Sequence, residues 1–284
     1  MIEEVRAESW IELQERLFEG AWNERLGRFR SDLAFRGQAD AAAGLVTTLA
    51  RLGGNYAELE RSLLRNFRKY ARRDAVAVDS PWDWLALAKH HNLPTRVVDW
   101  SYSPYVALHF ATADLAGAEV DAAVWCVDFV RTREALPDAL ADLLESEGSN
   151  VFTTELLGRA LDSLDKLDAL ADEEFVVFFE PPSLDERIVN QFALFSLMSS
   201  ATAQLQDWLG DRPGLARKVV VPAELKWEVR DKLDQANVTE RVLFPRLDGL
   251  SSWVTRHYSP RREASERTRA SARSPGGRAS ETAR

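Results

Sequence analysis

The stretch from His90 to Phe110 concentrates side chains that could do chemistry. It reads HHNLPTRVVDWSYSPYVALHF and sets two histidines, an arginine and an aspartate among Pro and Ser residues. Pro94 favours an extended backbone where a strand begins, and Arg96 and Asp99 carry opposite charges at nearby positions of that strand. Two interpretations of Arg96 and Asp99 stay open: a buried pair that locks the strand to its neighbours, and a pair of ligand-binding groups.

The polar residues after this strand predict an anion site. Ser103 and Pro104 are typical of an N-cap and a first helical position. The unpaired backbone N–H groups and the positive dipole end of such a helix attract negative charge. We therefore expect an anionic ligand near Asp99 and Ser101, with Ser101 and Ser103 among the residues that bind it.

His90 and His91 end a helix that is predicted to begin at Ser80. A cation there can satisfy the last carbonyls, so we expect one histidine to cap the helix and the other to face the site, with His91 as the catalytic candidate. No metal is expected, because none of the recognisable zinc spacings occurs. Asp99 and Glu180 could join in a magnesium site, but no paired acidic motif supports one.

Arg36 and Gln191 are candidates from distant parts of the chain. Arg36 ends the apolar run LAF and precedes Gly37, where the backbone can turn and a ligand can approach without meeting a Cβ. Its guanidinium suits bidentate phosphate or carboxylate binding, although a structural ion pair is an equal alternative. Gln191 lies at the mouth of an apolar strand predicted at 192–196, a place that suits both site residues and plain turns.

Periodicity predicts the elements that position these residues. Helices are expected at 9–26, 56–73, 80–91, 105–113, 136–144, 153–170, 201–209 and 222–233, and strands at 33–36, 95–100, 122–130, 174–179, 192–196 and 218–221. The short strands and uneven helices favour an α+β, or mixed α/β, fold over a regular doubly wound one. We expect a single domain with a mixed, mostly antiparallel sheet flanked by helices.

Composition favours a cytoplasmic protein. The single Cys126 lies in the apolar run AAVWCVDFV, which suits a packed thiol in a reducing compartment. The N-terminus is acidic and amphipathic, and no stretch reaches 18 uncharged apolar residues, so we expect neither a secretion signal nor a membrane span. The oligomeric state is left open.

Two basic segments contrast with a net charge of −9. Residues 259–284 hold seven Arg against three Glu and no apolar residue larger than Ala, so we predict a disordered tail after a globular domain at 1–258. The predicted helix 56–73 has a basic face with Arg61, Arg65, Arg68, Lys69, Arg72 and Arg73. For both segments, nucleic-acid contact and simple solvation stay open, although the acidic body argues against a broad nucleic-acid footprint.

Three stretches together resemble the FRG domain family, named for its Phe/Tyr-Arg-Gly tripeptide. They are FRG within 33–38, HHNLPTRVVDWSYSPYVALHFA, and RIVNQFALF followed by VLFPRLDGL, so that the resemblance spans about residues 33–250. The chain departs from the family pattern with Asn92 for Gly, Ser101 for Thr and Ala193 for Gly. Asn92 indicates a turn that accepts a left-handed Asn. The family is associated with bacterial stress and phage-defence settings.

The order of these motifs is similar to the three-part layout of ADP-ribosyltransferases. By that analogy Arg36 holds the dinucleotide phosphates, Ser101 with Ser103 supports the nicotinamide ribose, and Gln191 stabilises the oxocarbenium-like centre. The first hypothesis is an NAD-consuming transferase or glycohydrolase with Arg36, Arg96, Asp99 and Gln191 in the site and a nucleic acid or protein as acceptor.

Two other functions stay open. A non-catalytic sensor would use the same pocket to recognise a nucleotide, a nucleic acid or a partner protein. This hypothesis stays open because Gln191 stands in place of the usual glutamate. A nuclease with Asp99 and Glu180 as metal ligands is a distant third. None of the three hypotheses involves a membrane.

Overall fold

The computed structural model describes residues 1–71, 80–114, 117–183 and 185–260. The chain divides into two compact units, residues 1–239 and residues 240–284. The predicted tail falls almost entirely on residues 261–284, outside the described residues, so the predicted boundary after residue 258 stays a prediction. The same holds for Arg72 and Arg73 of the predicted basic helix.

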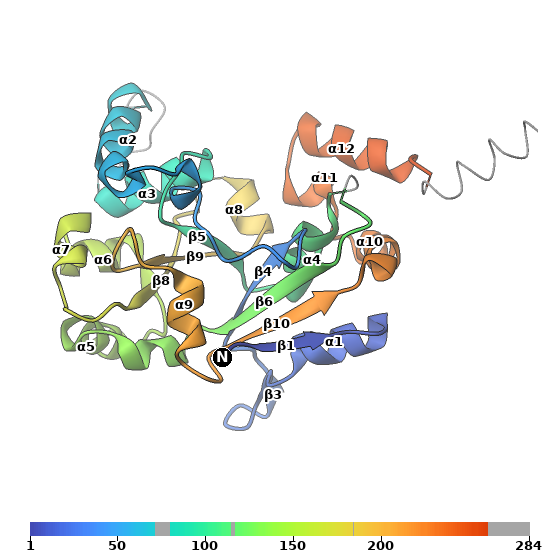
Figure 1. The fold of residues 1–284 in the computed structure, drawn as a ribbon, viewed down its shortest axis with the longest axis horizontal. Coiled ribbons are helices and arrows are strands. Elements are labelled where there is room, and N and C mark those ends of the chain that lie inside the picture. The colour runs from blue at the N-terminus through green and yellow to red at the C-terminus, as the bar shows by residue number, and fades with distance from the viewer. Residues whose placement is uncertain (72–79, 115–116, 184, 261–284) are drawn as a thin grey trace, which may run out of the picture. The chain divides into compact units, whose positions relative to one another are not determined.

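An eight-stranded mixed sheet forms the centre of the first unit (Figure 1). Its strand order is β1 (Glu3–Arg6), β10 (Ala216–Val221), β6 (Ala122–Asp128), β4 (Leu33–Gln38), β5 (Val98–Ser101), β9 (Ala193–Met198), β8 (Val176–Glu180) and β7 (Phe152–Thr153). The pairs β1–β10 and β7–β8 are parallel, and the other five are antiparallel. The predicted mixed α/β class with a mostly antiparallel sheet is confirmed.

Helices surround this sheet. Those of the first unit are α1 (Trp10–Phe18), α2 (Tyr56–Ala71), α3 (Pro81–His90), α4 (Pro104–Thr112), α5 (Asp138–Ser146), α6 (Thr154–Ala160), α7 (Leu164–Asp168), α8 (Glu186–Asn190), α9 (Leu205–Gly210) and α10 (Lys226–Gln235). Short 3₁₀ turns lie at Ala50–Leu52, Arg131–Ala135 and Ala223–Leu225, and a small hairpin pairs β2 (Trp22–Asn23) with β3 (Arg28–Phe29). No helix among the described residues is long and apolar enough to cross a bilayer.

Two predicted helices are shorter than the apolar periodicity indicated. The helix predicted at 9–26 ends at Phe18, because Gly20 adopts a left-handed conformation with φ of 77° and the chain turns into the hairpin. The helix predicted at 153–170 splits into α6 and α7, since Leu161 leaves the helical region and Ser163 caps a new helix by accepting a hydrogen bond from the backbone N–H of Lys166.

Both faces of the sheet are buried. On one face Phe35, Val124 and Val219 pack with side chains of α1, α4 and α10, while further along Phe179 and Phe195 pack with α3 and α6. The opposite face holds a tryptophan-rich cluster of Trp100, Trp125 and Trp208, the last from α9. Cys126 is buried as predicted, and burial raises the pKa of its thiol to about 12, so it stays protonated.

The described part of the second unit, residues 240–260, contains two helices, α11 (Glu240–Leu243) and α12 (Leu247–His257). The two helices approach closely at Gly249, where an added Cβ would meet the carbonyl oxygen of Phe244. The guanidinium of Arg256 donates hydrogen bonds of 2.7 and 2.8 Å to the Glu240 carboxylate. This buried charge pair joins the beginning of the unit to its last helix.

Candidate functional site

Strand order brings the predicted site residues together. Strand β5 lies between β4 and β9, and Ser101 at its end faces Phe35 on one side and Ala193 on the other. Arg36 therefore lies on one neighbouring strand, while Gln191 comes just before the other. The side chains that end these three strands surround a pocket of about 270 Å³, here named the β5 pocket.

Five of the eight predicted site residues line the β5 pocket: Arg36, Gly37, Asp99, Ser101 and Gln191. His91, Arg96 and Ser103 do not. The pocket also contains Lys89, His90 and Arg187, which the sequence reasoning did not assign to the site, and four aromatic residues, Phe35, Trp100, Phe110 and Phe195. The predicted roles of the five residues stay predictions.

Asp99 is held by two cations. Lys89 lies 2.7 Å from the Asp99 carboxylate, and Arg36 lies 3.6 Å from the same oxygen while donating a 2.8 Å hydrogen bond to the Asp99 carbonyl. The Lys89 side chain is only 9% exposed. The Asp99 carboxylate is half exposed, lines the pocket and pairs with these two cations, and its ligand-binding role stays a prediction.

One donor of the Arg36 guanidinium, the buried Nε, has no acceptor among the described residues. Burial lowers the pKa of the guanidinium, and the Asp99 charge offsets only part of that effect. A buried donor without an acceptor costs free energy, whereas an anionic ligand would satisfy the donor and compensate the charge.

Gln191 is fixed through its backbone. The hydroxyl of Ser101 donates a 2.7 Å hydrogen bond to the Gln191 carbonyl and accepts one of 3.0 Å from the Ser103 N–H. Phe192, the next residue, has a φ of 50°, a left-handed conformation that is rare for an aromatic residue and that often marks functional sites. The Tyr102 N–H donates to the Phe192 carbonyl and stabilises this turn.

The two predicted ribose-supporting serines are both used structurally. Ser103 is the N-cap of α4 and accepts a 3.4 Å hydrogen bond from the Val106 N–H, as the Ser-Pro signature predicted. It does not line the pocket. Ser101 lines the pocket, but its hydroxyl already joins β5 to the Gln191 turn. Its structural contribution is to position Gln191.

The histidine assignment is corrected. His91 is exposed and lies at the C-cap of α3, whereas His90 lines the pocket and contacts Asp185 through a 2.7 Å interaction of its Nε2. Burial alone would raise the pKa of Asp185, but the hydrogen bonds from His90 and from two backbone N–H groups of α8 outweigh it and lower that pKa. The left-handed Asn92 that the sequence predicted is confirmed, with a φ of 61°.

Arg96 belongs to the core and not to the pocket. Its guanidinium contacts the buried Glu60 through Nε at 2.8 Å and Nη2 at 2.6 Å, and it also pairs with Asp168. Burial opposes the charge of Arg96, but these two carboxylates outweigh it and raise its pKa. Of the two open interpretations, the structure favours the buried pair that locks the strand, with partners on α2 and α7.

Glycine is required at position 37 because α4 packs closely against β4 there. A Cβ built at Gly37 would lie 1.8 Å from the carbonyl oxygen of Ala107 and 2.6 Å from the backbone nitrogen of Ala111, both on α4. The sequence interpretation, in which the missing Cβ admits a ligand, is therefore incomplete. Gly37 lines the β5 pocket, but the close approach that demands glycine is the packing of α4 on β4.

The acidic residues of the nuclease hypothesis do not share the pocket. Glu180 accepts a 2.9 Å hydrogen bond from the Tyr102 hydroxyl and does not line the pocket that contains Asp99. Burial and the neighbouring Glu180 raise the pKa of Tyr102. Within the described ranges, no group of three or more His, Cys, Asp and Glu residues is arranged to hold a metal ion.

The charged and aromatic residues of the lining indicate the kind of ligand that the pocket suits. Arg36, Lys89 and Arg187 bring three positive charges to the pocket, and Asp99 is the one carboxylate among the described residues that line it. The aromatic rings of the lining are suited to a planar group. A mixed α/β domain with this pocket is a candidate binder of small anions that carry a ring.

The comparison with protein families supports the first two of the three motif stretches. The model of the FRG domain matches residues 31–119 of the chain. This segment carries Arg36, Gly37, Lys89, His90, Asp99 and Ser101, whereas Arg187 and Gln191 lie beyond it. No curated protein and no solved structure matches the chain.

Proposed function

We propose that this FRG domain binds a nucleotide in the β5 pocket, with NAD as the candidate ligand. The observation that carries the proposal is the meeting of three cationic side chains and the aromatic residues Phe35, Phe110 and Phe195 in one pocket. A nucleotide combines a phosphate anion with a planar base, and this lining offers a partner to each. At about 270 Å³ the pocket is sized for the phosphate and ring of one mononucleotide half, so the rest of a dinucleotide extends outside.

The proposed reaction is cleavage of the N-glycosidic bond of NAD. The bonding electron pair leaves with nicotinamide, and water or an acceptor nucleophile bonds to the ribose carbon and loses a proton. Positive charge develops on the ribose, and the carboxamide oxygen of Gln191 faces that charge with its negative dipole end. Asp99 supplies the carboxylate that takes the proton, and Arg36 with Lys89 holds the phosphates.

A non-catalytic sensor is the second candidate. The observation in its favour is that Lys89 and Arg36 already engage the Asp99 carboxylate as ion-pair partners. Gln191 also lacks the charge with which a glutamate would stabilise the ribose cation. Nucleotide binding without nicotinamide release is the expected behaviour of such a sensor, so one purified protein distinguishes the two candidates.

Replacing Arg36 with lysine is expected to weaken nucleotide binding by about 1–3 kcal/mol. Lysine keeps the charge but loses the planar pair of donors, including the Nε that has no partner among the described residues. Isothermal titration calorimetry with NAD and ADP-ribose measures the effect. The matched control is Arg28→Lys on the exposed β3 strand, which should bind like wild type. Equal affinities of the Arg36 variant and the wild-type protein would remove Arg36 from the ligand site.

Replacing Gln191 with alanine separates the enzyme from the sensor. If Gln191 acts on the transition state, the variant binds NAD almost as tightly as wild type and releases nicotinamide at least about tenfold more slowly. A nicotinamide-release assay, run with and without nucleic acid or phage, measures the rate. Wild-type binding without turnover in every condition supports the sensor. Absence of nucleotide binding and of turnover would refute both candidates.

The biological setting forms a separate part of the proposal. Resemblance to the FRG family leads us to propose a stress or phage-defence effector that acts in the bacterial cytoplasm. The acceptor of ADP-ribose would then be a nucleic acid or a protein. This part is supported by the family resemblance alone, whereas nucleotide binding is supported by the β5 pocket.

A further inference from the structure

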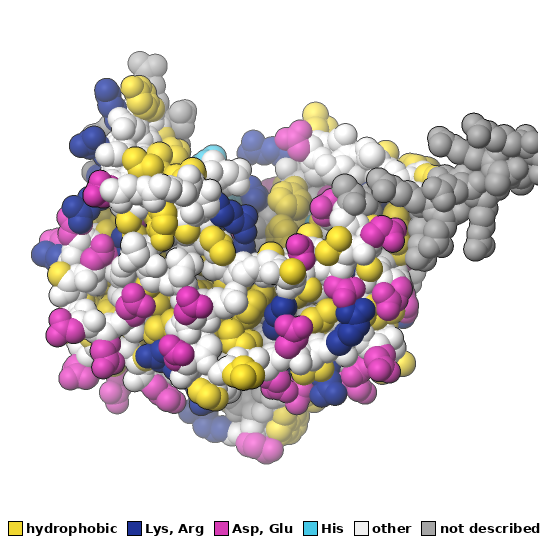
Figure 2. Space-filling view, viewed as in Figure 1, with side chains coloured by type: hydrophobic (Ala, Val, Ile, Leu, Met, Phe, Trp, Pro, Cys, Tyr) yellow, Lys and Arg dark blue, Asp and Glu magenta, His cyan; other side chains and the backbone are white. Residues whose placement is uncertain are grey.

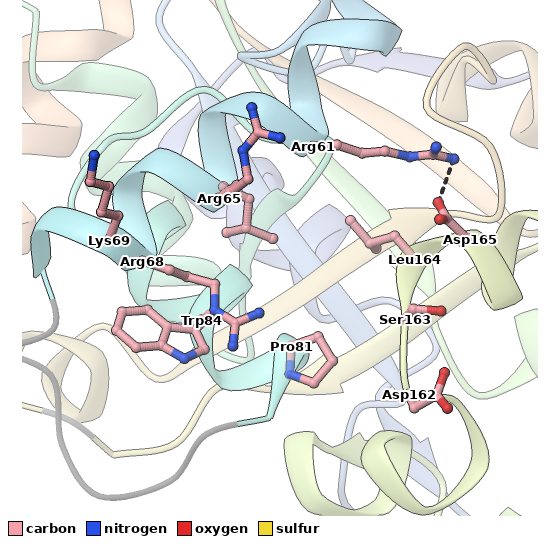
Figure 3. Close-up of a pocket in the computed structure, with 11 residues that line it drawn as sticks. Arg61, Arg65, Arg68, Lys69, Pro81, Trp84, Asp162, Ser163, Leu164 and Asp165 are labelled. Carbon is pink, nitrogen blue, oxygen red and sulfur yellow. Dashed lines mark ion pairs between the residues drawn. The ribbon is translucent and has the colours of Figure 1, made fainter.

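Basic side chains line the β5 pocket and also a separate groove beside α2. The groove contains Arg61, Arg65, Arg68 and Lys69 (Figure 3). The chain has a net charge of −9, and acidic side chains are spread over the face seen in Figure 2, whereas Lys and Arg side chains gather where α2 lies. Such a row of charges attracts anions of any kind and selects none. In the β5 pocket, by contrast, a contact behind the lining holds the helix that carries Arg187.

Helix α8 brings Arg187 to the β5 pocket, although little of this helix is buried. It has five residues, all of them described, and Ile188 is the buried one among them. A helix of this length is not stable by itself, so its position depends on contacts with the rest of the fold. At its C-terminal end, the Gln191 carbonyl accepts the hydrogen bond from the Ser101 hydroxyl.

The Asp185 carboxylate holds the other end of α8. Its Oδ1 caps the helix by accepting hydrogen bonds of 2.9 Å from the Arg187 N–H and 3.2 Å from the Ile188 N–H. Its Oδ2 accepts a 2.7 Å hydrogen bond from Nε2 of His90, because an ionised carboxylate can only accept. The two carboxylate oxygens therefore connect the backbone of Arg187 to a side chain of α3.

His90 gives this contact a rigid support. It is the last residue of α3, which buries Trp82, Trp84 and Leu85 in the core, and its own side chain is only 9% exposed. Asp185 does not line the β5 pocket. Asp185 can therefore act on a ligand in the pocket by its charge or through the residues that it holds, and these two effects have opposite signs for an anionic ligand.

We propose that His90 and Asp185 are a positioning pair that holds Arg187 in place to bind the phosphates of the nucleotide. Helix α3 supplies the support, and Asp185 transmits it to the first turn of α8. The Arg187 guanidinium then donates hydrogen bonds to the phosphate oxygens beside Arg36 and Lys89. This inference rests on the proposed nucleotide site and adds Arg187 to the groups that hold the phosphates.

The test compares two uncharged replacements of Asp185 in the full chain. Asp185→Asn keeps an oxygen for the cap and an amide that reaches His90, whereas Asp185→Ser keeps the cap but loses the atom that reaches His90. Isothermal titration calorimetry with ADP-ribose measures their affinities. Asp185→Asn should bind within about twofold of wild type, and Asp185→Ser at least about threefold more weakly, from the loss of roughly half of a charge-assisted hydrogen bond.

The comparison separates positioning from charge and from stability. Both variants lose one negative charge, and that loss by itself would strengthen the binding of an anion, so charge cannot explain a weaker Asp185→Ser. Asn and Ser are similarly good caps, so the two variants should melt at the same temperature.

A third variant tests whether the pair acts through Arg187. Arg187→Gln should weaken ADP-ribose binding about tenfold, because a charge-assisted hydrogen bond to phosphate is lost. Adding Asp185→Ser to Arg187→Gln should then change the affinity by less than about twofold, since the residue that Asp185 positions is already gone.

The possible failures are distinguishable. Equal affinities of Asp185→Asn and Asp185→Ser, with binding by wild type intact, would overturn the positioning pair and leave the nucleotide site standing. A loss in the double variant equal to the sum of the two single losses would show that Asp185 does not act through Arg187. No binding of ADP-ribose by wild type would overturn the nucleotide site and the positioning pair together.

Discussion

Replacing Arg96 with methionine is expected to lower the free energy of unfolding by about 3–5 kcal/mol while the β5 pocket keeps its ligand affinity. Arg96 is 4% exposed and compensates the charge of Glu60, which is 2% exposed. Methionine fills part of the volume but leaves the Glu60 carboxylate buried without a cation. It also removes the hydrogen bond from Nη1 to the Ser199 carbonyl. Urea unfolding measures the loss.

A second variant separates the charge effect from the loss of packing. Arg96→Met/Glu60→Leu removes both buried charges and should recover much of the stability, because an apolar pair can replace a buried ion pair at little cost. Asp168 is 32% exposed, so water can solvate it in both variants. A stable Arg96→Met protein that has lost nucleotide binding would contradict this account and return Arg96 to the ligand site.

Arg36 and Arg96 show what local sequence can and cannot predict. Arg36 lies in β4 and Arg96 lies just before β5, and the sequence left ion pairing and ligand binding open for each. The partners that decide between them are distant from Arg96 in the sequence: Glu60 lies on α2 and Asp168 lies on α7. No motif links these residues, so only the assembled fold separates the buried arginine from the one in the pocket.

The sequence predicted the pocket residues that lie in or beside strands and missed those that lie on helices. Arg36, Asp99 and Gln191 stood out because each polar residue flanks an apolar strand. Lys89 and Arg187 lie on helices, where basic residues are commonplace, so their charge alone did not distinguish them. The sequence favoured His91, whereas His90 lines the pocket, because one residue changes the direction of a side chain by about 100° around a helix.

Helix caps and turn conformations were the features that the sequence predicted most reliably. Ser80 and Ser103 cap α3 and α4 at the predicted positions, and Asn92 takes the predicted left-handed conformation. These features depend on residues a few positions apart. The second left-handed residue of the site, Phe192, had no such signal, because the turn that holds it depends on Ser101 and Tyr102 from β5 and its end.

Replacing Gly37 with alanine is expected to lower the free energy of unfolding by about 3 kcal/mol or more. The new Cβ would lie 1.8 Å from the Ala107 carbonyl oxygen, and both atoms belong to regular elements that cannot move independently. Strand β4 pairs with β5 and β6, while α4 packs its buried Leu108 against the core. The methyl group must therefore separate helix from sheet, which exposes apolar surface and disrupts the pocket.

The matched control is Gly210→Ala at the end of α9, where an added Cβ meets no atom within 4 Å and the backbone has no positive φ. That variant should be as stable as wild type or slightly more stable, because alanine favours the helix. Urea unfolding of both proteins, together with NAD titration below their transitions, distinguishes the two functions of Gly37. A Gly37→Ala protein of normal stability with lost ligand affinity would show that a ligand, and not α4, requires the glycine. The packing of α4 against β4 predicts the opposite result. The free energy of unfolding falls, and NAD affinity is lost only as a consequence, when the separation of α4 from β4 disrupts the pocket.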